Sequence, residues 1–259
     1  MQPDVPLLEY DPGRDAVIEP TRVVAPIAIA PACVLCFFHE VISRWEANGS
    51  LRLVTHLTST IGRHAVYEWH NGDEPITLVH PGLGAPLAAM LLEELIALGC
   101  RAFVVCGGAG VLDKDVAAGH LIVPSAAVRD EGTSYHYVPP AREIMINASA
   151  VTTITATLAA RDVPFRLAKT WTTDAVYRET AQRVSARKAE GCLAVEMEVA
   201  ALAAVAQFRS VPLGAILYGG DDVSGLTWDR REHLDRGAAR EALARLAASA
   251  CIALLNDTR

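Results

Sequence analysis

The 259-residue chain carries a net charge of −7 at neutral pH, and 51% of its residues are hydrophobic. A chain of this length buries one large core, so we expect a single domain spanning residues 1–259. The acidic balance disfavours nucleic acid and anionic membranes as partners, because both require a basic patch. No signal-peptide pattern and no membrane-length apolar run are visible, so we expect a cytoplasmic protein that binds a small molecule.

Residues 1–31 contain seven prolines or glycines and little periodicity, which predicts an extended arm on the surface or on a neighbouring subunit. The next segments alternate between strand-like and helix-like patterns. A Gly-rich turn at 81–86 opens the second helix, and Gly99 closes it. In this half we expect strands at 32–38, 51–57, 64–69 and 75–80, helices at 39–46 and 86–98, and a hairpin turn at Asn71-Gly72.

The second half continues the alternation, which is typical of an α/β fold. A buried strand at 102–106 runs into Gly107-Gly-Ala-Gly110, where a ligand could approach the backbone closely; a plain tight turn is the alternative. We expect further strands at 121–124, 167–172 and 213–219, and helices at 149–161, 179–189, 191–208 and 235–255.

The six cysteines are spread through apolar segments and not spaced as a disulfide framework. Cys33 and Cys36 have the spacing of a zinc or redox motif, but they lie in a strand-like run, where positions three apart face opposite sides. No pair of histidines has the spacing of a metal site. We therefore expect free thiols, no metal and no cofactor.

The Ala-rich segment 191–208 carries two carboxylates near its start. On a helical wheel Glu198 falls on the apolar stripe of the expected helix, whereas Glu196 falls where charges are ordinary. A carboxylate on a buried stripe costs several kcal/mol unless it is paired or faces a polar cavity. A first-turn glutamate favoured by the helix dipole is the alternative, and it suits Glu196 better. Glu198 is therefore the stronger functional candidate.

Polar residues gather after three predicted strands: at 107–110, at 172–178 and at 219–222. Ligand crevices of α/β sheets lie outside the carboxyl ends of strands, so we expect these segments to converge. Asp221 is a candidate general acid, while Asp222 fits a capping role equally well. His136, between two tyrosines, is the histidine best placed for a pocket. No G-x-S-x-G elbow supports a serine hydrolase.

Taken together, Gly82-Leu-Gly-Ala-Pro86, Gly107-Gly-Ala-Gly110, Val195-Glu-Met-Glu198 and the strand ending at Asp221 resemble the nucleoside phosphorylase superfamily, especially its uridine phosphorylase-like branch. The resemblance implies a three-layer α/β/α sandwich with a mixed central sheet. It also implies a homo-oligomer, a dimer or hexamer, whose sites borrow residues across an interface.

The same resemblance implies roles for individual residues. Met197 would pack under the ribose, Glu198 would accept hydrogen bonds from its 2′ and 3′ hydroxyls, and Asp221 would protonate a purine at N7. The substrate-binding set would also include Glu196, Tyr177, Arg178, Gly107, Gly108, Ala109 and His136. Inorganic phosphate would be a co-substrate.

The chain departs from that family at the expected phosphate site. The loop after the first strand lacks the Gly-x-x-x-Arg pattern, and Val105 and Gly108 replace an Arg and a Thr. A dianion needs Arg forks or backbone amides, and Arg63, Arg129 and His39 are the candidate substitutes. Phosphorolysis is thus one hypothesis, hydrolysis by water a second, and a catalytically silent nucleoside-binding protein a third.

Overall fold

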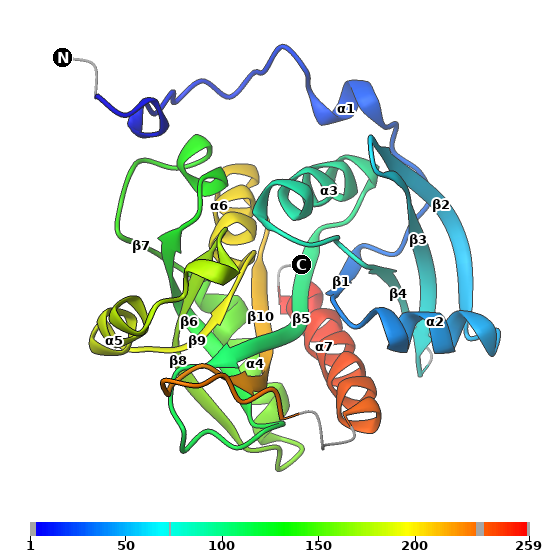
Figure 1. Ribbon diagram of the computed structural model, residues 1–259. Coiled ribbons are helices and arrows are strands. Elements are labelled where there is room, and N and C mark those ends of the chain that lie inside the picture. The colour runs from blue at the N-terminus through cyan, green and yellow to red at the C-terminus, as the bar shows by residue number, and fades with distance from the viewer. Residues whose placement is uncertain (1–3, 73, 232–235, 258–259) are drawn as a thin grey trace.

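The computed structural model describes residues 4–72, 74–231 and 236–257. Ten strands form one mixed sheet with helices on both faces (Figure 1). The strands are β1 Ala32–Cys36, β2 Leu51–Ser59, β3 Gly62–Asn71, β4 Glu74–Val79, β5 Ala102–Val111, β6 Leu121–Asp130, β7 Glu143–Met145, β8 Phe165–Thr173, β9 Cys192–Glu196 and β10 Leu213–Asp222.

The sheet has an open part and a closed part. Strand β10 pairs with both β6 and β5, so β5, β9, β8, β6 and β10 form a small ring. From β5 the sheet continues through β1, β4, β3 and β2 as an open wing, in which β2, β3 and β4 are antiparallel. Strands β1, β5 and β10 run parallel, so their carboxyl ends meet at one edge.

Helices cover both faces and complete three layers. They are α2 His39–Ala47, α3 Ala85–Leu98, α4 Ala148–Ala159, α5 Ala181–Ala189, α6 Val199–Arg209 and α7 Gly237–Asp257. Side chains of β1 alternate between two cores, as a strand buried on both faces requires. Cys33 and Leu35 join the core under α3 and α6, whereas Val34 joins the core under α7. The expected three-layer fold with a mixed sheet is confirmed.

The N-terminal arm contains two short turns, η1 Pro6–Leu8 and α1 Pro20–Val23. It runs along the outer ends of α6 and α3 of its own chain (Figure 1). The guanidinium of Arg14 donates to the carbonyl of Phe208, and the amide of Ile27 donates to the carbonyl of Leu98. No helix in the described residues is long and apolar enough to cross a membrane.

The expected helix at 191–208 is wrong over its first eight residues, 191–198. Residues 192–196 form β9, which pairs with β8 on one side and β5 on the other, and α6 begins only at Val199. Gly191 precedes the strand with a φ of +88°. Hydrogen bonding to two neighbouring strands outweighs the helix propensity of this Ala-rich segment.

Smaller differences concern element ends and one short strand. Strand β6, expected at 121–124, continues to Asp130. Strand β5 continues through the glycines to Val111, where they were expected to leave the strand. The three-residue strand β7 was not expected, since so short an element leaves almost no pattern. The start of the last helix, expected at 235, lies outside the described residues, and α7 begins at Gly237.

Candidate active site

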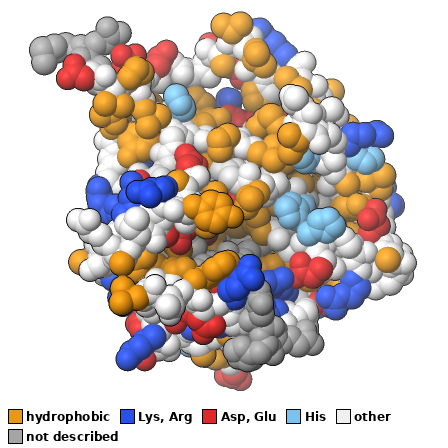
Figure 2. All heavy atoms as spheres, in the orientation of Figure 1, with side chains coloured by type: hydrophobic (Ala, Val, Ile, Leu, Met, Phe, Trp, Pro, Cys, Tyr) orange, Lys and Arg blue, Asp and Glu red, His pale blue; other side chains and the backbone are white. Residues whose placement is uncertain are grey.

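A cavity of about 500 Å³ opens at the edge where β1, β5 and β10 end. Figure 2 shows this face hollowed near its centre, with hydrophobic, acidic and basic side chains around the hollow. Seven predicted site residues line the cavity: Gly107, Gly108, Ala109, Glu196, Met197, Glu198 and Asp221. The three expected polar segments therefore do converge: the parallel strands β5 and β10 carry 107–110 and 219–222 to this edge, and β8, which runs in the opposite direction, carries 172–178 there beside β9.

The glycines of β5 form one wall of the cavity. A Cβ on Gly107 would lie 3.2 Å from the ring of Phe37, which also lines the cavity. A Cβ on Gly108 would meet nothing within 4 Å, so this position leaves space open to a ligand. Val105, which lies two residues before Gly107 on β5, adds an apolar surface to the same wall.

Glu196 ends β9 and is 7% exposed. Its Oε1 accepts from the hydroxyls of Thr172 (2.6 Å) and Thr170 (3.2 Å). Its Oε2 accepts from the amides of Glu198 (2.7 Å) and Val199 (2.6 Å). Burial raises the pKa of Glu196, and these four donors act in the opposite direction. The expectation of an ordinary exposed charge is wrong, since this carboxylate fixes the junction between β9 and α6.

Glu198 is the N-cap residue of α6, is 6% exposed and lines the cavity. Its Oε1 accepts from the amide of Gly84 at 2.6 Å. Gly84 has a φ of +88°, which glycine adopts far more readily than other residues. This backbone conformation directs the Gly84 amide toward the carboxylate of Glu198. Burial, and then the neighbouring charge of Glu196, raise the pKa of Glu198 to about 8. The protonated form of Glu198 is therefore favoured at neutral pH.

Asp221 and Glu179 also line the cavity. The indole of Trp228 donates to Oδ2 of Asp221 at 2.5 Å. Burial, and then the charge of Asp221, raise the pKa of Glu179 to about 7. The cavity therefore holds an acidic pair, one of whose members titrates near neutrality.

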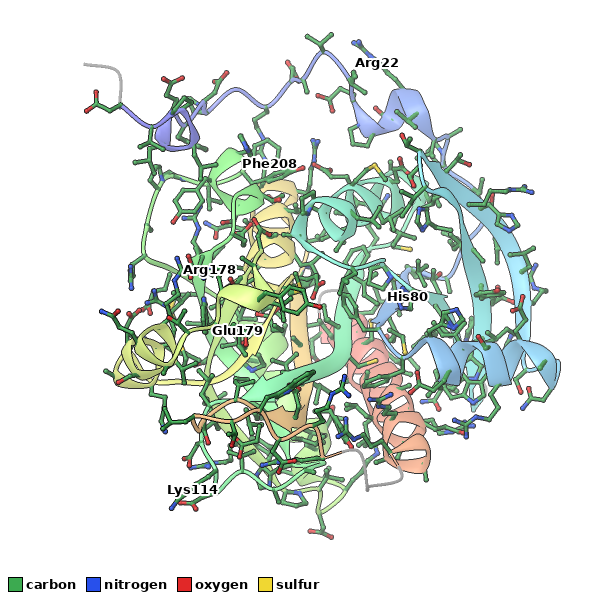
Figure 3. All side chains as sticks on the ribbon, in the orientation of Figure 1. Arg22, His80, Lys114, Arg178, Glu179 and Phe208 are labelled. Carbon is green, nitrogen blue, oxygen red and sulfur yellow. The ribbon has the colours of Figure 1, made fainter. Side chains whose placement is uncertain are left out.

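The sequence indicated the segment of Glu179 but not this residue. Tyr177 is 95% exposed, and neither it nor Arg178 lines the cavity. They belong to the 3₁₀ turn η3 Val176–Arg178, and Figure 3 shows Arg178 and Glu179 at this turn. Residues three apart on such a turn share a side, which is why Val176 and Glu179 face the cavity together.

Two arginines also line the cavity, Arg236 just before α7 and Arg240 within its first turn, and no sequence pattern singled them out. Arg236 donates to the carbonyls of Arg230 and Arg231, and Arg240 pairs with Glu40. The Nε atoms of Arg236 and Arg240 are buried without a partner within the described part of the chain. They bring positive charge to the wall that contains Asp221.

His80 follows β4 and lines the cavity beside Gly82. Its Nδ1 accepts from the amide of Gly82 at 3.1 Å, so the neutral ring carries its proton on Nε2. Burial, and then the nearby His39, lower the pKa of His80. A histidine after a strand is a weak sequence signal, and this one was missed.

Four other expected residues lie elsewhere. Arg129 is buried, and its guanidinium donates to Ser134 and to the carbonyls of Val138 and Pro139, which leaves it no free edge toward the cavity. His136 lies on the turn η2 Thr133–His136, away from the cavity lining. Arg63 and His39 line a second, smaller cavity that also includes His80.

Residues 46–256 match the family model described as Phosphorylase superfamily. A guanosine phosphorylase from Halorubrum lacusprofundi is 30% identical over 141 residues, which cover 54% of this chain and 58% of that protein. A uridine phosphorylase from Treponema pallidum is 32% identical over 199 residues, which cover 69% of this chain and 76% of that protein. The match thus spans little more than half of the first relative and about three quarters of the second.

Solved structures share the fold. A uridine phosphorylase from Vibrio fischeri superposes with a TM-score of 0.71 at 24% identity, over 89% of this chain and 93% of that one. An AMP nucleosidase from Bacteroides thetaiotaomicron superposes with a TM-score of 0.70 at 21% identity, over 89% and 91%. The similarity extends through both the open and the closed parts of the sheet.

Proposed function

This chain belongs to the phosphorylase superfamily, and we propose that it cleaves the N-glycosidic bond of a nucleoside by phosphorolysis, which releases a free base and a sugar 1-phosphate. The observation that carries the proposal is Glu198, a buried carboxyl group held at the cavity wall by the Gly84 amide. A buried carboxylate needs more donors than the backbone amides beside it supply, and a sugar diol provides two.

The sugar end of the substrate would lie against Met197 and Glu198. The thioether of Met197 provides an apolar surface for one face of the ribose. Glu198 would accept hydrogen bonds from the 2′ and 3′ hydroxyls, and these donors favour its ionised form. The resulting carboxylate would stabilise the positive charge that develops on the sugar as the glycosidic bond breaks. Glu196 acts through its neighbour, because it fixes the backbone at Glu198.

The base end would lie against Asp221 and Glu179. The departing base takes the electrons of the glycosidic bond, and a proton delivered to a ring nitrogen neutralises it. Glu179, whose pKa is about 7, can hold that proton beside Asp221 at neutral pH. An acid at this end favours a purine, whose N7 accepts the proton.

Hydrolysis is the second candidate function. Its motivating observation is that Val105 and Gly108 contribute no side-chain donor to the cavity wall, and attack by water requires no site for a dianion. Phosphorolysis is supported by the two relatives described above, which are named guanosine phosphorylase and uridine phosphorylase. An AMP nucleosidase with the same fold keeps the hydrolytic alternative open.

Assembly as a homo-oligomer is part of the proposal. Four exposed hydrophobic side chains surround the cavity: Leu83 and Val176 line it, Tyr177 follows Val176, and Trp228 contacts Asp221. A second copy of the chain over this rim would remove these side chains from water and close the site.

The decisive experiment follows base release from purine and pyrimidine nucleosides with and without inorganic phosphate. Phosphorolysis predicts release that requires phosphate and yields sugar 1-phosphate. Release of equal rate without phosphate would replace it with hydrolysis. Turnover that Glu198→Ala abolishes and Glu74→Ala retains would exclude a silent binding protein, since Glu74 is exposed at the start of β4.

A further inference from the structure

A second cavity, of about 270 Å³, adjoins the first through His80, which lines both. Its walls come from α2, from β3 and from the residue that follows β4. Figure 2 shows histidine side chains gathered beside the central hollow, and Figure 3 places His80 between β4 and α2. The position of His80 makes the second cavity a side chamber of the candidate active site.

The groups around this side chamber favour an anion. Arg63 and three histidines, His39, His64 and His80, contribute to its lining. Its one carboxylate, Glu46, already accepts from the hydroxyl of Tyr67 at 2.7 Å. Nothing in the described residues forms a group of His, Cys, Asp and Glu that could hold a metal ion. Arginine and imidazolium together are the usual partners of phosphate oxygens.

Neighbouring hydrogen bonds orient the three rings. Nδ1 of His39 lies 2.9 Å from the Ser43 hydroxyl, and Nε2 of His64 lies 2.8 Å from the Ser59 hydroxyl. Nδ1 of His80 accepts from the Gly82 amide. His39 is also the first residue of α2, where the helix dipole favours negative charge.

We propose that this side chamber, formed by His39, Arg63, His64 and His80, binds a phosphate group whose position beside His80 brings it to the sugar end of the nucleoside cavity. The proposal rests on the proposed function and names the anion that this site takes. Two sources have this chemistry: inorganic phosphate as the nucleophile, and the 5′-phosphate of a nucleoside monophosphate.

Binding of the phosphate group takes up protons. His39 and His64 lower the pKa of His80 by their proximity, after the larger effect of burial. An anion among the three rings offsets this repulsion and favours the protonated form of His80. The other charged or titratable groups of the chamber are Arg63, Glu46 and Tyr67. Binding therefore tightens as the pH falls from about 8 to 6.

The binding test uses the full chain without nucleoside. Sulfate, which stays a dianion over this range, and inorganic phosphate are titrated by calorimetry, while NMR follows the histidine ring signals. We expect the signals of His39, His64 and His80 to move together. Arg63→Gln should weaken binding at least tenfold, whereas Arg52→Gln, an exposed arginine paired with Glu68 outside the chamber, should leave it unchanged. Ring signals that do not move would overturn the proposal, as would equal effects of the two substitutions.

A kinetic test separates the two sources of phosphate. With inorganic phosphate as the ligand, Arg63→Gln raises the KM for phosphate and leaves the KM for nucleoside unchanged. With a 5′-phosphate as the ligand, base release from a nucleoside monophosphate needs no added phosphate, and Arg63→Gln raises the KM for that nucleotide alone. If the anion binds but no base is ever released, the proposed function fails and the phosphate site stands. If base is released and Arg63→Gln changes neither KM, the site fails and the function stands.

Discussion

The carboxylate of Glu196 accepts the backbone amide of Glu198 at 2.7 Å, so two buried acids meet at the junction of β9 and α6. They differ in what surrounds them. Glu196 has four donors within the protein, whereas Glu198 faces the cavity and has a pKa raised to about 8. Glu196 therefore holds the backbone of the site in place, and Glu198 can form hydrogen bonds with a ligand.

Glu198→Gln should abolish base release and at the same time stabilise the protein at high pH. The folded pKa of Glu198, about 8, exceeds its ordinary value of 4.5, so the folded state binds the proton more tightly than the unfolded state does. Stability is therefore lost as the pH rises from about 4.5 to 8, by on the order of 3 kcal/mol. Denaturant unfolding at pH 5 and pH 8 measures the effect. An advantage of the variant that does not grow with pH would contradict the assignment.

Glu196→Gln should destabilise the fold and lower activity indirectly. Its amide NH₂ group would face either two backbone N–H donors or two threonine hydroxyls, and one pair would lose its acceptor. Loss of such buried hydrogen bonds costs about 1–3 kcal/mol. Thermal unfolding measures this cost, with Glu74→Gln as the exposed control. Equal melting temperatures for the two variants would show that the four hydrogen bonds contribute nothing net.

Glu179→Gln should change the pH profile of kcat/KM. If Glu179 holds the proton that reaches the base, activity falls as the pH rises through about 7. Glutamine cannot titrate, so the variant should be slower and lose that step in the profile. Arg178→Gln is the matched control, because Arg178 lies on the adjacent turn and outside the cavity lining. A step near pH 7 that persists in Glu179→Gln would assign it to another group.

Gly84→Ala should weaken the sugar end of the site. At a φ of +88° and a ψ of +148° an alanine is strained by about 1–3 kcal/mol, although a Cβ would have space. Relief of that strain turns the amide away from Glu198 and leaves the carboxyl group without this donor. We expect a loss of about tenfold or more in kcat/KM with a small loss in melting temperature. Gly49, which also has a positive φ and lies in a surface turn, provides the control substitution Gly49→Ala.

The alternation of strands and helices was predictable, because hydrophobic periodicity and glycine positions are local properties of the chain. Met197, Glu198 and Asp221 do line one cavity, as their resemblance to family motifs led us to expect, and their individual roles stay predictions. Strand β9 was not, because its formation depends on partners supplied by β5 and β8, which are distant in the sequence. Alanine-rich composition favours a helix until those partners are present.

The missed cavity residues share a physical cause. Glu179 faces inward only because η3 is a tight turn, and Arg236 and Arg240 reach the cavity only because α7 packs beside β5 and β10. The burial of Glu196 likewise depends on hydroxyls from β8. Tertiary contacts set these orientations, and no local pattern encodes them. The only signal for Glu179 in the sequence was its position three residues after the apolar Val176.

The most direct measurement is the identification of products from a purine nucleoside incubated with the protein and inorganic phosphate. We predict free base and sugar 1-phosphate in equal amounts, at a rate that depends on phosphate and is lost in Glu198→Ala. Free base with unphosphorylated sugar at an unchanged rate without phosphate would contradict phosphorolysis. Absence of any base release from purine and pyrimidine nucleosides alike would contradict cleavage of the N-glycosidic bond.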